Sequence, residues 1–195
     1  PTNDPEKRVD SKKDRAMRRL ILLRHAKTES HAPSGEDIDR RLDARGLDDA
    51  AAIGRWMAEQ RCRLGHVLVS TAVRARQTWD IVAPLLGDAA IEVTYLRELY
   101  LAEPADILRA IRETGGIDAR CLMVIGHNPG LHELALMLTG SRRDDALRLL
   151  AGNLPTSGLL VIDFEIDDWG DVAFRQGRLM QFVSPKLLRQ TSNDV

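Results

Sequence analysis

The stretch "RRLILLRHAKTES", residues 18–30, is an apolar run that ends in polar residues. Its centre, residues 19–24, predicts a buried strand, because a short apolar run is typical of a strand that is covered on both faces. The strand ends abruptly in Arg24 and His25, and the chain then turns polar. A buried strand that delivers an arginine and a histidine at its end raises the expectation of a site there.

Strand-like and helix-like segments alternate along the rest of the chain. Further strands are expected at 66–70, 91–96 and 121–127, and helices at 46–60, 74–86, 103–114 and 130–140. Residues 158–166 and 171–182 predict two strands joined as a hairpin. Alternation of this kind predicts an α/β domain with a largely parallel sheet.

The bulk composition is that of an ordinary globular domain. The chain has 195 residues, 44% of them hydrophobic and 29% charged, and a formal net charge of −1. This balance does not favour nucleic acid or an anionic membrane as a partner, and no apolar run reaches the ~20 residues that cross a bilayer. We therefore expect neither partner, and we expect a monomer.

The cellular compartment is inferred from the cysteines and the first residues. Cys62 and Cys121 do not form a disulfide framework or a zinc motif, so reduced thiols are expected. Residues 1–17 are charged and lack the apolar centre of a secretory signal, which indicates a flexible tail. Together these features favour the cytoplasm.

Polar side chains follow three of the expected strands. Arg24 and His25 end the first, Ser70 ends the second and is followed by Arg74, and His127 and Asn128 follow the strand at 121–127. Ligands of open α/β sheets bind outside the carboxyl ends of the strands. The sequence therefore predicts one site at this edge of the sheet.

The residue types at these strand ends suit a phosphate dianion. Arginine guanidinium groups match phosphate oxygens and stay charged at working pH. A neutral imidazole such as that of His25 can attack phosphorus, and nearby arginines help keep it unprotonated. His127 can donate to phosphoryl oxygens, and Glu98 is a candidate acid for the leaving group. Each residue alone has an ordinary structural explanation, so the prediction depends on the set.

Other catalytic templates fit less well. The segment "GHNPG", 126–130, lacks the glycines and the Gly-Lys-Ser/Thr ending of a P-loop. The low aromatic content, 4% of the chain, does not favour binding of single-stranded nucleic acid. No G-x-S-x-G, His-Glu-x-x-His or paired CxxC motif is present. We therefore expect no metal and no cofactor.

The motifs in their order resemble the histidine phosphatase superfamily, with its phosphoglycerate mutase-like fold. "LILLRHAKTE" resembles its Arg-His-Gly signature, with Ala26 in place of the usual glycine. The short bacterial phosphohistidine phosphatases have segments similar to "DIDRRLDARG" (37–46), in which Arg41 stands where proline is common. Further similar segments are "VSTAVRARQT" (69–78), "VIGHNPGLHELA" (124–135) and "LPTSGLLVIDF" (154–164).

This resemblance implies a fold and a set of roles. It implies a three-layer αβα sandwich with an antiparallel edge to the sheet, and one catalytic domain over 18–183 between the tail at 1–17 and a C-terminal tail at 184–195. It makes His25 the nucleophile that becomes a phosphohistidine, with three phosphate-binding partners. These partners are Arg24, Arg74 and His127.

The remaining site residues are expected from their places beside these motifs. Lys27, Arg40 and Asn128 are expected to bind the substrate together with the two arginines. Glu98 corresponds to the acid of related mutases and phosphatases.

Three functions remain open at this point. The first is a metal-independent phosphatase that acts on phosphohistidine in a protein such as a histidine phosphotransfer domain, because the short chain has no insertion that would roof the site. The second is a phosphomonoesterase for a small molecule, a sugar phosphate or a nucleotide. The third is a phosphate-binding module without turnover.

Overall fold

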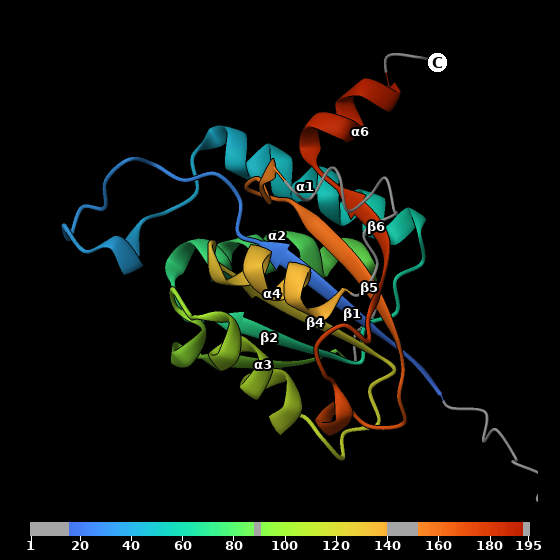
Figure 1. Cartoon of the computed structure of the whole chain (residues 1–195). Coiled ribbons are helices and arrows are strands. Elements are labelled where there is room, and N and C mark those ends of the chain that lie inside the picture. Colours follow the sequence, from blue (N-terminus) through green and yellow to red (C-terminus); the bar gives the residue numbers. More distant parts are fainter. Residues whose placement is uncertain (1–15, 88–90, 140–151, 193–195) are drawn as a thin grey trace, which may run out of the picture.

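A six-stranded sheet forms the centre of the protein. The computed structural model describes residues 16–87, 91–139 and 152–192, and the strands lie in the order β3-β2-β4-β1-β5-β6 (Figure 1). Their bounds are β1 Met17–Arg24, β2 His66–Ser70, β3 Glu92–Leu96, β4 Cys121–Gly126, β5 Leu159–Glu165 and β6 Arg178–Val183.

The pairing confirms a mostly parallel sheet with an antiparallel edge. β1 is parallel to β4, and β2 is parallel to both β4 and β3. β5 is antiparallel to β1, and β6 is antiparallel to β5. The three strands with polar ends, β2, β4 and β1, are therefore neighbours that run in one direction.

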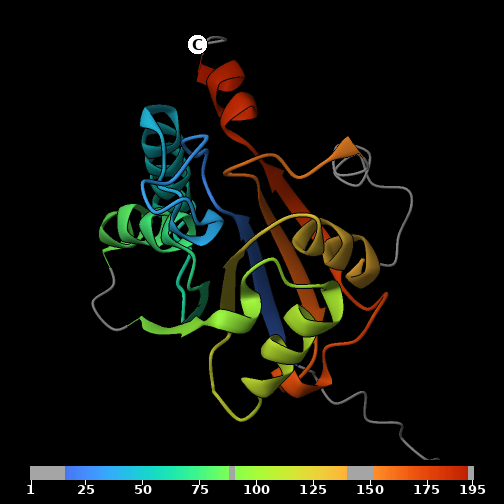
Figure 2. The same cartoon turned by 90° about the vertical axis from the view of Figure 1, so that its left-hand side faces the viewer.

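Helices cover both faces of the sheet and make it the middle of three layers. α1 and α2 lie on one face, and α3 and α4 lie on the other (Figures 1 and 2). The helices are α1 Ala44–Glu59, α2 Val73–Leu86, α3 Pro104–Glu113, α4 Gly130–Leu138 and, near the C-terminus, α6 Pro185–Ser192.

The apolar run of β1 explains why both faces must be covered. Its side chains alternate between two core clusters, because successive residues of a strand point to opposite faces. Leu20 and Leu22 pack in the cluster under α3 and α4, whereas Ile21 and Leu23 pack in the cluster under α1 and α2. All four side chains are fully buried.

The prediction of a strand over 171–182 is wrong for the first half of that range. Strand β6 begins at Arg178, and the 3-10 helix η3, Trp169–Asp171, precedes it. The backbone N–H groups of Arg175 and Gly177 donate to carbonyls of Met137 and Leu138 at the end of α4. These bonds hold residues 172–177 against α4, so the segment cannot pair with β5.

The two expected tails also differ from the structure at their inner ends. Strand β1 begins at Met17, which was expected to belong to the tail, while residues 1–15 lie outside the described part. The segment expected as a C-terminal tail forms helix α6, and Arg189 donates to the buried carboxylate of Asp49 on α1 at 2.7 Å. The last three residues lie outside the described part, as does residue 140, the expected end of the α4 segment.

Two further findings concern the cysteines and membrane-spanning segments. Cys62 and Cys121 are both free thiols, as expected. Within the described ranges, we find no helix that combines the length and apolar character needed to cross a membrane.

Candidate active site

The ends of β1, β2 and β4 bring the predicted residues together. Arg24 ends β1 opposite Gly126, the last residue of β4, and the His25 backbone N–H donates to the Gly126 carbonyl at 3.1 Å. His127 therefore follows β4 directly beside His25, and the two imidazole centroids are 5.1 Å apart. The convergence expected from the sequence is confirmed.

A pocket of about 490 Å³ opens at this edge of the sheet. Seven of the residues that line it were expected in the site from the sequence, and four were not. The expected residues are Arg24, His25, Lys27, Arg40, Arg74, His127 and Asn128, and the others are Thr28, Asp37, Leu101 and Thr156.

His25 is held with one defined ring nitrogen facing its cationic neighbours. Its Nδ1 lies 2.8 Å from the Ala26 carbonyl oxygen, which can only accept, so Nδ1 carries the proton. The other nitrogen, Nε2, then has a lone pair, and the Nε–H of Arg74 donates to it at 3.3 Å. The side chain is 8% exposed. The geometry presents a neutral imidazole nitrogen to the pocket.

The pKa of His25 is depressed, which keeps the imidazole neutral. Burial lowers the pKa of His25 to about 4, and the charges of Arg74 and Arg24 add to the effect. The sequence pointed to the arginines as the cause, whereas burial is the larger one. At neutral pH the lone pair on Nε2 is therefore free of a proton.

Ala26 replaces a glycine of the family signature without strain. The backbone of Ala26 is not in the left-handed region. Among the described non-glycine residues, Leu101 is an example of one that is. The Ala26 backbone N–H donates to the Thr78 hydroxyl oxygen at 3.0 Å. The turn after His25 therefore does not require the conformational freedom of glycine.

His127 is buried and neutral. Its Nε2 lies 2.7 Å from the Ser70 hydroxyl, and its Nδ1 is buried without a hydrogen-bond partner among the described residues. Burial lowers the pKa of His127 to about 3, and the neighbouring His25 contributes. The Tyr100 ring meets the His127 ring edge to face at 5.5 Å.

The two arginines are anchored differently. Arg24 donates through Nη1 to the Leu154 carbonyl at 2.8 Å, and its Nε is buried without a partner among the described residues. Burial and the charge of Arg74 lower the pKa of Arg24. Arg74, from the first turn of α2, is only 3% exposed. The guanidinium groups of Arg24 and Arg74 thus share one pocket, which Arg40 also lines.

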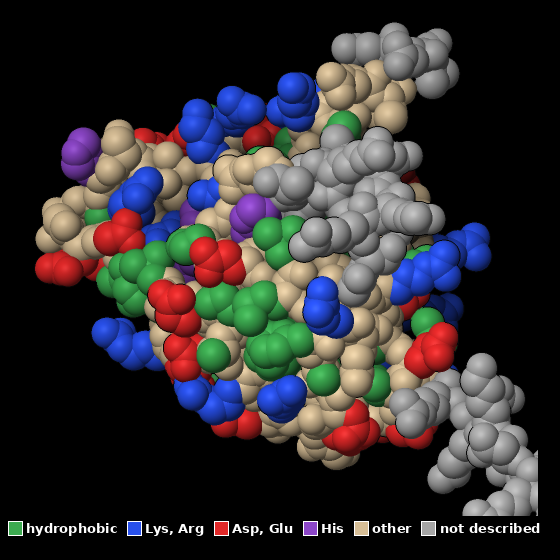
Figure 3. All heavy atoms as spheres, in the orientation of Figure 1, with side chains coloured by type: hydrophobic (Ala, Val, Ile, Leu, Met, Phe, Trp, Pro, Cys, Tyr) green, Lys and Arg blue, Asp and Glu red, His purple; other side chains and the backbone are tan. Residues whose placement is uncertain are grey.

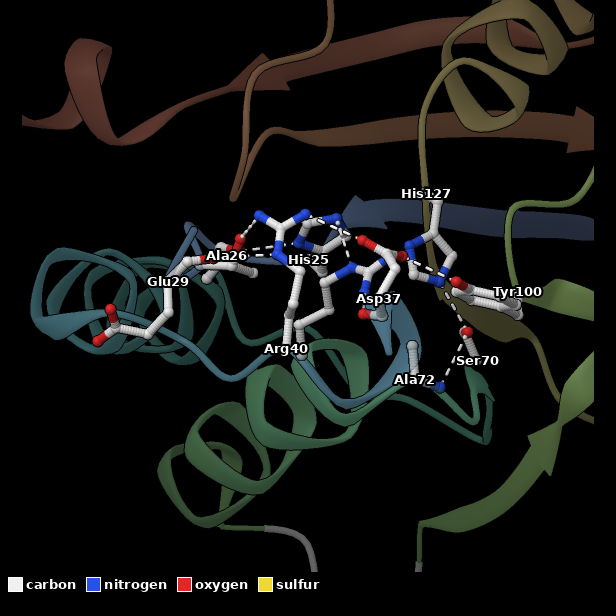
Figure 4. Close-up of polar contacts among 11 residues, drawn as sticks. His25, Ala26, Glu29, Asp37, Arg40, Ser70, Ala72, Tyr100 and His127 are labelled. Atoms are coloured by element: carbon white, nitrogen blue, oxygen red, sulfur yellow. Dashed lines mark hydrogen bonds and ion pairs between the residues drawn. The ribbon is translucent and has the colours of Figure 1, made fainter. Parts of the chain in front are cut away.

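Asp37 is a site residue that the sequence reasoning did not select. It begins the 3-10 helix η1, Asp37–Asp39, in the connection between β1 and α1. Its Oδ2 accepts from Arg74 Nη2 at 2.9 Å and from the Tyr100 hydroxyl at 2.8 Å (Figure 4). Its Oδ1 accepts from Arg40 Nη1 at 3.0 Å. Asp37 is the first residue of the segment at 37–46 that resembles the short bacterial phosphohistidine phosphatases. That resemblance was the sequence signal that could have identified Asp37 as a site residue.

The carboxylate of Asp37 is ionised. Burial acts to raise the pKa of Asp37, but the three side-chain hydrogen bonds outweigh it and lower the pKa to about 2. Burial and the bond to Asp37 also raise the pKa of Tyr100. At neutral pH Asp37 is a hydrogen-bond acceptor.

Three other expected residues lie at the rim or outside the pocket. Lys27 is exposed at the rim, 3.8 Å from Asp43. Asn128 is half-buried and donates to the Leu154 carbonyl at 2.8 Å. Glu98 lies in the 3-10 helix η2, Arg97–Leu99, where it is exposed and does not line the pocket. The structure therefore does not bring the expected acid to the other site residues.

The arrangement can accept a dianion and attack it. Two arginines supply charge, one neutral imidazole supplies a lone pair, and a second neutral imidazole can donate a hydrogen bond. Within the described ranges, no three His, Cys, Asp or Glu side chains are grouped as metal ligands.

Comparison with known proteins gives consistent similarities. A family model described as histidine phosphatase superfamily (branch 1) matches residues 20–136. An uncharacterised protein of Mycobacterium leprae is 32% identical over 172 residues, which cover 84% of this chain and 100% of that protein.

Two solved structures have a similar fold along most of their length. A chain from Agrobacterium tumefaciens, provisionally named phosphohistidine phosphatase SixA, has a TM-score of 0.71 and 32% identity, and the match covers 86% of this chain and 98% of that chain. A chain from Nakamurella multipartitia with the same provisional name has a TM-score of 0.75 and 28% identity, with coverage of 88% and 99%.

Proposed function

Because this chain belongs to the histidine phosphatase superfamily, we propose that it is a metal-independent phosphatase that removes phosphate from phosphohistidine on a protein, such as a histidine phosphotransfer domain. The reaction passes through a phosphorylated His25. One observation carries the proposal: the Nδ1–H of His25 is held by the Ala26 carbonyl at 2.8 Å, so that Nε2 presents its lone pair beside Arg74.

In the first step His25 Nε2 attacks phosphorus. A bond forms between Nε2 and phosphorus as the bond from phosphorus to the leaving group breaks. Arg24 and Arg74 bind the non-bridging oxygens, and His127 donates through Nδ1 as charge on these oxygens is rearranged. In the second step water attacks phosphorus, and His25 is released with inorganic phosphate.

The protonation of the pocket favours a leaving group that needs no acid. When the second ring nitrogen of phosphohistidine carries a proton, the leaving group is a neutral imidazole, whose conjugate acid has an unperturbed pKa of ~6.5. An alkoxide is a far stronger base that must be protonated as it leaves. Asp37, the carboxylic acid among the pocket-lining residues, is ionised at rest. Phosphohistidine is therefore a better match to this pocket than an alkyl phosphate.

The surroundings of the pocket support a protein substrate. Leu101 lines the pocket and is 53% exposed. Exposed apolar side chains also gather over α3 and α4 (Figure 3), and Leu136 and Met137 on α4 are each 41% exposed. Two of the similar solved structures are provisionally named phosphohistidine phosphatases.

A small phosphate ester is the second candidate substrate. A pocket of about 490 Å³ has room for a sugar phosphate, and its polar lining would accept the phosphate group in the same way. The mechanism at His25 would be unchanged, and only the leaving group would differ.

The test compares these substrates directly. The purified protein is incubated with EDTA against a phosphohistidine-bearing transfer domain and against a panel of sugar phosphates, nucleotides and one aryl phosphate. His25→Ala is run in parallel, and His31→Ala serves as the matched control, because His31 is exposed and does not line the pocket.

Each outcome separates the candidate functions. Rapid loss of phosphohistidine that EDTA leaves unchanged and His25→Ala abolishes supports the proposal. Strong turnover of one ester, with the phosphoprotein untouched, assigns the protein to small-molecule chemistry. Binding of phosphate without turnover of any substrate would leave the phosphate-binding module as the function.

A further inference from the structure

Asp37 is the sole carboxylic acid among the eleven residues that line the pocket. Its side chain is 43% exposed, so water reaches it. It belongs to the connection between β1 and α1, whereas the other chemically active side chains come from the strand ends and from α2. The first half of the proposed mechanism, attack by His25, does not use it.

The carboxylate is fixed in position by several neighbours. Arg74 binds Asp37 twice, through Nη1 to its backbone carbonyl at 2.7 Å and through Nη2 to the carboxylate oxygen Oδ2 at 2.9 Å. The Tyr100 hydroxyl and Arg40 Nη1 occupy further directions. Figure 4 shows Asp37 between His25 and Tyr100. A side chain held in this way can serve as an oriented acceptor.

One edge of the Arg74 guanidinium joins Asp37 to the nucleophile. The Nε and Nη2 groups lie on the same edge of the guanidinium; Nε donates to His25 Nε2 at 3.3 Å, and Nη2 donates to Asp37 Oδ2 at 2.9 Å. A phosphoryl group on His25 Nε2 therefore lies in the same pocket as the Asp37 carboxylate, and Arg74 contacts both residues.

That position matters because phosphoryl transfer proceeds in line. The entering and leaving atoms lie on opposite sides of phosphorus. When His25 carries the phosphoryl group, the attacking water must therefore enter from the side opposite Nε2, and Asp37 is the carboxylate among the pocket-lining residues that can accept its proton.

We propose that Asp37 is the general base that orients and deprotonates the water that hydrolyses phosphorylated His25. This inference rests on the phosphatase function proposed above and assigns its second step. The ionised state of the resting carboxylate, which its hydrogen bonds maintain, suits an acceptor of a water proton.

The step balances without a further reactant. The water oxygen forms a bond to phosphorus as the bond between phosphorus and His25 Nε2 breaks, and the electron pair of that bond returns to Nε2. One water proton passes to the Asp37 carboxylate. Inorganic phosphate leaves, Asp37 gives its proton to solvent, and the resting site is restored.

The experiment follows the two half-reactions separately. An aryl phosphate, or a transfer domain labelled with radioactive phosphate on histidine, is mixed rapidly with the protein. The burst of the leaving group reports phosphorylation of His25, and the acid-labile phosphate on the protein reports its hydrolysis. The variant is Asp37→Asn, which keeps the shape of the side chain and removes its basic oxygen.

Two further variants complete the design. Asp39→Asn is the matched control, because Asp39 lies on the same 3-10 helix, accepts from the Ser34 hydroxyl at 2.8 Å and does not line the pocket. Asp37→Glu restores a carboxylate at the same position. Thermal unfolding of each variant shows that the fold is intact.

We expect Asp37→Asn to keep the burst and to slow hydrolysis by about 100-fold or more, the range of general base catalysis, so that phosphorylated protein accumulates. Asp37→Glu should recover part of the hydrolysis rate. Equal slowing of both half-reactions would show that Asp37 only positions Arg74, and it would overturn the inference. A wild-type rate in Asp37→Asn would overturn it as well.

Failure of the underlying function has a different signature. If the wild-type protein shows neither a burst nor labelled histidine, the phosphohistidine mechanism itself is wrong and the assignment of Asp37 falls with it. A wild-type burst with an unchanged hydrolysis step in Asp37→Asn refutes the role of Asp37 alone.

Discussion

Ser70 and His127 form a buried pair in which the Ser70 Oγ lies 2.7 Å from the His127 Nε2. The Ala72 backbone N–H donates to the same oxygen at 3.3 Å, and the hydroxyl hydrogen of Ser70 is available to donate to His127 Nε2. With Nε2 accepting, the imidazole proton of neutral His127 must lie on Nδ1. Donation from Ser70 would thus select the His127 tautomer that can donate to a phosphoryl oxygen.

Ser70→Ala is therefore expected to lower kcat by about fivefold to tenfold, the loss of one modest hydrogen bond. Nitrogen NMR of the His127 ring should show a mixture of tautomers in the variant and a single Nδ1–H form in the wild type. Thr71→Ala is the control, because it removes a neighbouring buried hydroxyl that has no partner within the described residues. A variant with a single, unchanged tautomer would contradict the role of Ser70.

The pH dependence of catalysis should reflect His25. Protonation of Nε2 removes the lone pair, and burial lowers the pKa of His25 to about 4. We expect kcat/KM for an aryl phosphate to show no loss from His25 protonation between pH 7 and 5, and to fall about tenfold per pH unit below about pH 4. Circular dichroism at each pH shows whether the fold is retained. An acid limb centred near pH 6.5 would indicate an exposed, unperturbed nucleophile.

The same two histidines should make stability depend on pH. Both are neutral in the folded protein above pH 4, because their pKa values lie at about 4 and about 3, whereas in the unfolded chain they take up protons near pH 6.5. The unfolded state therefore binds more protons as pH falls below 6.5, and the free energy of unfolding decreases with it. The full shift of His25 corresponds to on the order of 3 kcal/mol.

Urea unfolding between pH 7.5 and 5 measures this effect above the range in which most carboxylates titrate. We expect the midpoint to decrease over this interval in the wild type. The double variant His25→Ala, His127→Ala should lose most of that decrease. Equal slopes in the two proteins would show that the buried histidines are not its source.

The sheet and the strand-end residues could be predicted because their signals are local. A continuous apolar run that ends in polar residues, as in 19–25, predicts both the strand and the edge at which its last side chains emerge. Neighbouring parallel strands then bring Ser70, His25 and His127 to one edge without any knowledge of loops.

The surroundings of the site could not be predicted in this way because they depend on loop conformation. Asp37 meets Arg74 and Tyr100 across 37 and 63 positions of sequence, through a connection that has no periodic pattern. The late start of β6 has a similar cause, since backbone bonds from Arg175 and Gly177 to the end of α4 determine it. Neither contact follows from the hydrophobic periodicity of the local sequence.

Glu98 provides the last test, because the sequence indicated it as the acid and the structure places it elsewhere. It is exposed on η2 and does not line the pocket, whereas Asp37 lines the pocket and contacts Arg74. We expect Glu98→Gln to change kcat/KM by no more than about twofold, as for an ordinary surface substitution. The comparison is made with an alkyl and an aryl phosphate, because loss of a general acid would slow the alkyl ester far more. A selective loss with the alkyl ester would restore Glu98 as the acid and require η2 to approach the pocket when substrate binds.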